Sequence, residues 1–90
     1  MPAVEMDNEE VISRAHAKIH ESAYMVTTLP GNEQRQHGYD SYVLGYLEAL
    51  KAENLLSQDS YMQLVAEHKR AFKVASQLHP DAGKPGALLQ

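Results

Sequence analysis

The chain has 90 residues, no cysteine and a formal net charge of −4. A chain of this length forms one small domain and buries only about 60–65% of the surface that its unfolded form exposes, so a full core leaves little room for a deep substrate pocket. The absence of cysteine excludes disulfides, thiolate metal ligands and thiol nucleophiles. The acidic net charge argues against nucleic acid as a partner, because affinity for the phosphate backbone comes from lysine and arginine.

The sequence predicts neither a membrane span nor an export signal. No apolar run approaches the ~20 residues that a span needs, and the N-terminus MPAVEMDNEE is acidic where a signal peptide would be basic and then apolar. We therefore expect a cytoplasmic protein that does not bind membranes. Its expected organisation is an acidic tail over residues 1–6, one helical domain over 7–79 and a flexible tail over 80–90.

The first helix is predicted to begin at Asp7 and to end before Pro30. The Asp7 carboxylate can cap the free amides of the first turn while Glu10 reaches back to it, as in a capping box. Pro30 disfavours a helical backbone at the residue before it, and Gly31 suits a turn. An apolar stripe follows at helical spacing: Ile12, Ala15, Ile19, Ala23 and Val26.

Two further helices are predicted to form an antiparallel hairpin from about residue 39 to residue 79. The polar segment 31–38, bounded by glycines, fits either a loop or the first turn of the second helix. Asn54 tolerates the left-handed backbone that ends a helix, and Ser57 can cap the helix that follows. Pro80 lacks an amide hydrogen, so the third helix is predicted to stop near His79.

The two hairpin helices each carry an apolar face, and no segment shows sustained alternation of polar and apolar residues. The predicted core faces are Tyr39, Val43, Tyr46, Leu47 and Leu50 on the second helix, and Tyr61, Leu64, Val65, His68, Ala71, Phe72, Ala75 and Leu78 on the third. Three helices with partial apolar stripes predict an all-α fold, a small three-helix bundle built on the hairpin.

His16 and His20 are four residues apart, the spacing at which two imidazoles on one helix can reach one metal ion. A third ligand would have to come from elsewhere, such as His37 or His68. The glutamate of an HExxH motif is missing between the pair, so we assign no metal site and no cofactor. His68 is expected to be a hydrogen-bonded core residue, and Glu67 is expected to face water.

Tyrosine dominates the aromatic residues, with five tyrosines against one phenylalanine and no tryptophan. Its apolar ring and polar hydroxyl suit half-buried positions and protein interfaces. Tyr24 and Tyr42 fall away from the apolar stripes, which makes them candidate protein-binding residues. Gly45, with Ala49 one turn later, lowers the helix surface and permits a close neighbour.

The stretch from residue 67 to residue 81, EHKRAFKVASQLHPD, resembles the second helix and the following His-Pro-Asp tripeptide of J-domain co-chaperones. The resemblance implies contact with a seventy-kilodalton heat-shock ATPase. The residues it implicates are the tripeptide His79, Pro80 and Asp81, and the basic face Lys69, Arg70 and Lys73. The chain departs from the family after Asp81, because nine residues that include two glycines and a proline cannot form the family's next long helix.

No glycine-rich phosphate loop, nucleophile motif or forced pair of carboxylates is present in the sequence. We therefore expect a non-enzymatic chain that binds another protein and regulates or inhibits a larger host assembly, by analogy with small proteins encoded by phages and other mobile elements. The alternatives are an incomplete J-domain-like co-chaperone, a metal-binding regulator, an acidic mimic of nucleic acid, and a chain that self-associates as a homodimer.

Overall fold

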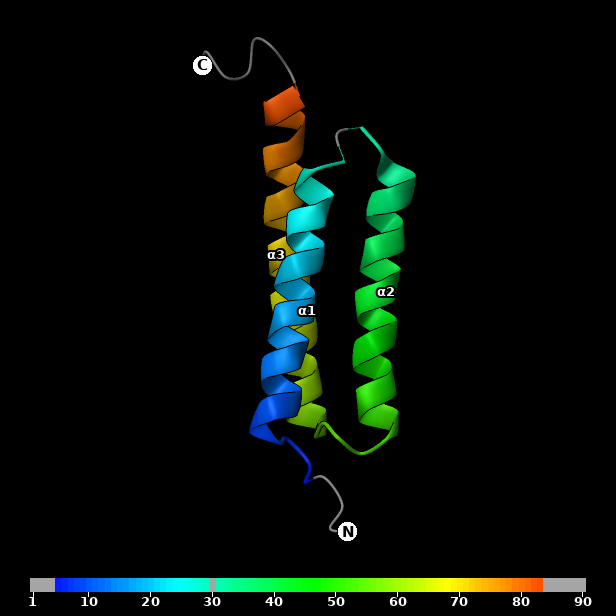
Figure 1. The fold of residues 1–90 in the computed structure, drawn as a ribbon, viewed down its shortest axis with the longest axis vertical. Helices are drawn as coiled ribbons and strands as arrows, with labels where there is room; N and C mark the ends of the chain where they lie inside the picture. The colour runs from blue at the N-terminus through cyan, green and yellow to red at the C-terminus, as the bar shows by residue number, and fades with distance from the viewer. Residues whose placement is uncertain (1–4, 30, 84–90) are drawn as a thin grey trace.

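The computed structural model describes residues 5–29 and 31–83, with side chains described as far as Gln77. Three helices run up, down and up: α1 (Glu9–Thr27), α2 (Glu33–Ala52) and α3 (Gln58–Gly83). Figure 1 shows α1 and α3 parallel to each other, with α2 antiparallel beside them. No strand occurs in the described residues, and the three helices pack against one another, which confirms the all-α three-helix bundle.

The most extensive helix–helix interface joins α1 to α3. The predicted hairpin of α2 and α3 is present, but it is not the centre of the fold. Only Val43 and Leu47 of α2 are fully buried. Among the residues whose side chains are described, the core consists of Ala15, Ile19, Ala23, Val26, Val43, Leu47, Leu56, Leu64, Phe72 and Ala75, with the buried polar residues Ser22 and His68. Its apolar members match the predicted stripes, apart from Leu56 in the α2–α3 connection.

The predicted cap of α1 at Asp7 is wrong by one residue, and the helix itself begins at Glu9. Asn8 is the N-cap, and its side-chain oxygen accepts a hydrogen bond of 2.9 Å from the amide of Glu10. Asp7 instead connects the N-terminal segment to the start of α3, because its carboxylate accepts a 2.9 Å bond from the amide of Ser57. The backbone amide of Asp7 also donates to the carbonyl of Leu55 at 2.9 Å. Asp7 therefore holds two distant parts of the chain together.

The polar segment after the first helix is the beginning of α2 rather than a loop. Asn32 is the N-cap, and its side chain accepts a 3.0 Å hydrogen bond from the amide of Arg35. Gly31 has a φ of +72°, a left-handed conformation that glycine adopts without steric cost. The turn between α1 and α2 is therefore short, which forces the two helices to be antiparallel neighbours.

The end of α2 has the geometry predicted from the sequence. Asn54 has a φ of +60°, and its amide bonds to the carbonyl of Lys51 at 3.0 Å. The amide of Leu55 bonds to the carbonyl of Leu50 at 2.9 Å, which completes a Schellman motif. Ser57 then caps α3, since its hydroxyl oxygen accepts a 3.2 Å bond from the amide of Ser60.

α3 is longer than predicted, because it continues through Pro80 to Gly83. Figure 1 shows its last turns extending beyond the C-terminal end of α1. A proline near the end of a helix removes one backbone hydrogen bond without preventing the final turn. The tail predicted over 80–90 therefore begins inside α3, and residues 84–90 lie outside the described part. Among the described residues, no helix combines the length and hydropathy that crossing a membrane requires.

Candidate functional site

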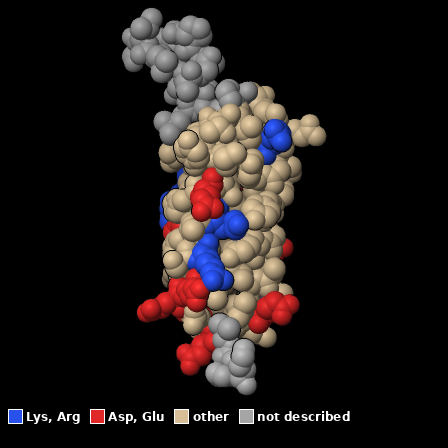
Figure 2. Space-filling model, viewed as in Figure 1, with Lys and Arg blue, Asp and Glu red and all other residues tan. Residues whose placement is uncertain are grey.

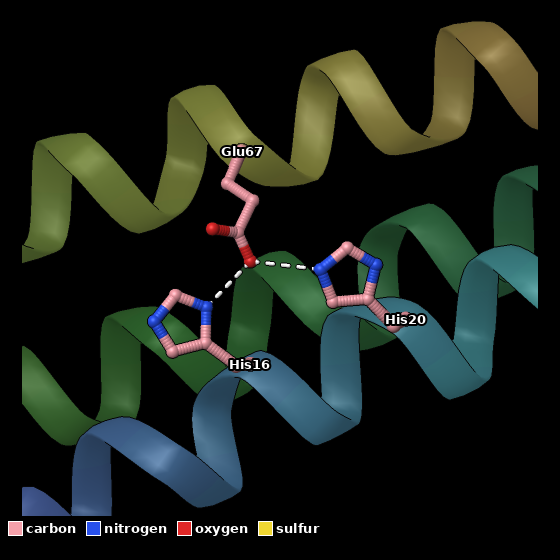
Figure 3. Close-up of side chains that lie close together, drawn as sticks. All are labelled: His16, His20 and Glu67. Carbon is pink, nitrogen blue, oxygen red and sulfur yellow. Dashed lines mark hydrogen bonds and ion pairs between the residues drawn. The ribbon is translucent and has the colours of Figure 1, made fainter.

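Two histidines of α1 and one glutamate of α3 converge at the seam between these helices. His16 Nδ1 lies 2.6 Å from Glu67 Oε2, and His20 Nε2 lies 3.1 Å from the same oxygen. Figure 3 shows both rings directed at that one oxygen atom. The four-residue spacing places the two rings on one face of α1, and the parallel packing of α3 brings Glu67 over them. These three residues are called the His–His–Glu cluster below.

The cluster is partly shielded from water. The side chain of Glu67 is 24% exposed, against 46% for His16 and 61% for His20. Burial by itself would raise the pKa of Glu67, but the hydrogen bonds and charge attraction from the two histidines outweigh it. The net pKa of Glu67 is therefore lower than that of an ordinary glutamate, and the carboxylate stays ionised at neutral pH.

The cluster has the composition of a metal-binding site. The three ligand atoms lie within 4.8 Å of one another. The sequence indicated the two histidines, and it offered His37 and His68 as a possible third ligand, but the structure places neither of them beside the pair. His37 is exposed on α2, and His68 is fully buried with Nε2 2.6 Å from Asp40 Oδ1.

Glu67 was predicted to face water, and that prediction is wrong. It follows the buried Leu64 by three residues and precedes Ala71 by four, so it lies at the edge of the core face of α3. That spacing is the signal that could have identified it. Whether such an edge residue faces solvent or a neighbouring helix depends on how α3 is rotated about its axis. The spacing of apolar residues does not determine that rotation.

Two grooves follow the α1–α3 seam on either side of the cluster. One, called the apolar groove below, has His20 and Glu67 at its near end. It is lined by His20, Ala23, Tyr24, Thr27, Glu67, Arg70, Ala71, Val74 and Ala75. The other is more polar and is lined by Asp7, Ile12, His16, Ser60, Gln63, Leu64, Ala66, Glu67 and Arg70. Glu67 and Arg70 line both grooves, so the cluster lies between them.

The predicted protein-binding residues do not share one face. Tyr24 and Arg70 line the apolar groove. Lys69 and Lys73 line a separate groove between α2 and α3. His79 and Asp81 fall within α3, but their side chains lie outside the described part of the structure.

The two predicted binding residues of α2 lie apart from the seam. The ammonium group of Lys18 is 5.4 Å from the ring centre of Tyr42 and 5.6 Å from that of Tyr46, which ties α2 to α1. A hydrogen bond with Tyr42 and attraction to its phenol raise the pKa of Lys18. Gly45 is exposed, and a Cβ added there would meet no atom within 4 Å.

Charge is unevenly distributed over the surface. Figure 2 shows acidic side chains gathered toward the lower end of the face it presents, with few charges over the upper part of the bundle. The lower end is formed by the start of α1 and the turn between α2 and α3 (Figure 1). The upper part of this face is therefore covered mainly by uncharged residues.

No family model, curated protein or solved structure matches the chain. The J-domain resemblance therefore rests on its 15 residues alone. Within those residues the tripeptide lies inside α3 rather than after it.

Proposed function

We propose that this chain is a non-catalytic protein-binding module that regulates or inhibits a larger protein assembly, and that its partner inserts an amphipathic helix into the apolar groove. One observation carries the proposal. Two large apolar side chains, Tyr24 at 67% exposure and Val74 at 55%, line the same groove from different helices. Neither is needed for the core, and both would lose contact with water when a partner binds.

The lining of the apolar groove supports a helix as the occupant. Ala23, Ala71 and Ala75 are small, so they let a backbone approach closely between the larger side chains of Tyr24 and Val74. A groove between two helices that presents apolar anchors to an incoming helix is a recurring mode of peptide recognition. Fully burying one large apolar side chain contributes about 1.5–3 kcal/mol, so two such anchors can provide a specific contact.

The charge beside the groove supports an acidic partner segment. Arg70 lines the groove, and among the described residues no carboxylate forms an ion pair with it. A helix that carries acidic residues beside its apolar face would be steered to this end of the bundle and kept in register by Arg70.

Site-specific photo-crosslinking in the native host tests the proposal. A benzoylphenylalanine is placed at Val74, inside the groove, and in a control chain at Met62, which is 58% exposed on the same helix but lines neither groove of the seam. We expect irradiation to join position 74, and not position 62, to one host protein. The purified partner should then bind Val74→Lys at least tenfold more weakly than Met62→Lys.

Three outcomes would contradict the proposal. Equal capture from positions 62 and 74 would show that the groove is not the docking surface. A cross-linked homodimer from position 74 would assign the groove to a second copy of the chain. Capture of a heat-shock ATPase would replace the regulator by the co-chaperone alternative.

A further inference from the structure

We infer that His16, His20 and Glu67 form a Zn²⁺ site that links α1 to α3. The inference rests on the convergence of two imidazole nitrogens and one carboxylate oxygen, all within 4.8 Å of one another. Three protein ligands of this kind, with a fourth position open to water, are the donor set of many zinc sites. His20 and Glu67 also line the apolar groove, but the argument for the site does not rest on the protein-binding function proposed above.

The three ligand atoms can surround the ion after a rotation of their side chains. With metal–ligand bonds of about 2.0–2.2 Å, tetrahedral ligand atoms lie about 3.3 Å apart. The contacts of His16 Nδ1 and His20 Nε2 to Glu67 Oε2 are 2.6 and 3.1 Å, so they must lengthen by about 0.7 and 0.2 Å to reach that distance. His20 is 61% exposed and can rotate toward His16 without disturbing the core. The helices themselves can stay in place.

The donor set selects the metal. Imidazole nitrogens favour zinc and its transition-metal neighbours, whereas Ca²⁺ and Mg²⁺ require mostly oxygen ligands. The 46% and 61% exposure of the two histidines leaves a solvent-facing side for the fourth ligand. Each imidazole must offer a free ring nitrogen and Glu67 an ionised carboxylate to the ion, so Zn²⁺ and protons compete for the same atoms. Binding should therefore release protons and weaken as the pH falls.

The charged groups around the cluster determine its affinity for Zn²⁺. Glu67 supplies the negative charge that attracts the ion. Arg70 lines both adjoining grooves and opposes it. Asp7 lines the polar groove, but its carboxylate is engaged by the amide of Ser57. Replacing Arg70 by Gln should therefore tighten Zn²⁺ binding severalfold, an effect that a merely nonspecific association with surface histidines would not show.

Zn²⁺ titration of the full, untagged chain tests the site. Because the ligands come from two helices, binding to the folded state alone should raise the melting temperature by on the order of 10 °C at about 100-fold excess over the dissociation constant. Calorimetry should give one ion per chain. His16→Ala and Glu67→Gln should each weaken binding at least tenfold. His37→Ala, which removes an exposed histidine of α2, is the matched control and should leave the affinity unchanged.

A second measurement keeps the test independent of folding changes in the variants. Co²⁺ in place of Zn²⁺ should give the intense visible absorption of a four-coordinate centre in the wild type and lose it in His16→Ala. Mg²⁺ at the same concentration should not stabilise the chain. The inference is overturned if Zn²⁺ leaves the wild-type melting temperature unchanged, or if His37→Ala weakens binding as much as His16→Ala does.

Discussion

His68 is the one fully buried ionisable side chain among the described residues, and Asp40 is its hydrogen-bond partner. Its Nε2 lies 2.6 Å from Asp40 Oδ1, its Nδ1 has no described partner, and its ring packs against Phe72 with centroids 4.2 Å apart. The contact joins α2 to α3. Losing it would leave a buried imidazole with no described hydrogen-bond partner at either nitrogen.

Asp40→Ala should therefore destabilise the chain by about 1–3 kcal/mol, the cost of leaving a buried polar group unpaired. Urea unfolding at pH 7 measures the change. Glu48→Ala, an exposed acidic residue on the same helix, should change the free energy of unfolding by less than about 0.5 kcal/mol. Equal losses in the two variants would show that the Asp40 contact contributes nothing to stability.

The lowered pKa of Glu67 predicts a pH dependence of stability. A carboxyl whose pKa is lower in the folded state stabilises that state above its ordinary unfolded pKa of about 4.3. The stabilisation is lost as the pH falls through the lower folded value. Glu67→Gln should therefore lose less stability than the wild type between about pH 5 and pH 3, measured by urea unfolding. If the free energy of unfolding falls equally in the two proteins between pH 5 and pH 3, Glu67 makes no such contribution.

At the scale of elements, the features that the sequence predicted correctly are local. The Schellman motif at Asn54 and the cap at Ser57 involve residues within five positions of each other. The contacts that the sequence did not reveal span the chain, 50 positions from Asp7 to Ser57 and 51 from His16 to Glu67. They depend on how the helices rotate against one another, which apolar periodicity leaves undetermined.

The C-terminal turn of α2 should be sensitive to residue shape at one position. Asn54 has a φ of +60°, where a β-branched residue costs roughly 1–2 kcal/mol and glycine costs nothing. Asn54→Val should lower the free energy of unfolding by that amount, and Asn54→Gly should preserve it. The control is Glu53→Val, the neighbour with an ordinary φ of −86°. Equal stability of the two valine variants would refute the role of the left-handed residue.

The three helices should also differ in local stability. α2 buries two side chains, whereas α1 buries five. Opening α2 therefore exposes less core than opening the α1–α3 pair. Native-state hydrogen exchange should show faster exchange in the middle of α2 than in the middles of α1 and α3. Uniform protection across the three helices would show that the bundle opens only as one unit.

At the scale of the whole molecule, the described residues form a small apolar core, and two of the exposed apolar side chains, Tyr24 and Val74, line the apolar groove. The core stripes and the number of helices could be predicted from the sequence because burial imposes a 3.6-residue period. The proposed docking surface could be predicted only in part. Tyr24 was identified because it lies off the stripe, but Val74 was not, because an exposed valine on a helix has no distinctive pattern until the neighbouring helix is in place.

The central claim is that the chain acts through the seam between α1 and α3. Titration of the ¹⁵N-labelled chain with its purified partner, followed by amide chemical shifts, tests it most directly. The account predicts the largest shift changes in residues 20–27 and 67–75, with little change around Tyr42 and Gly45 of α2. Changes centred on α2, with the seam unaffected, would contradict it.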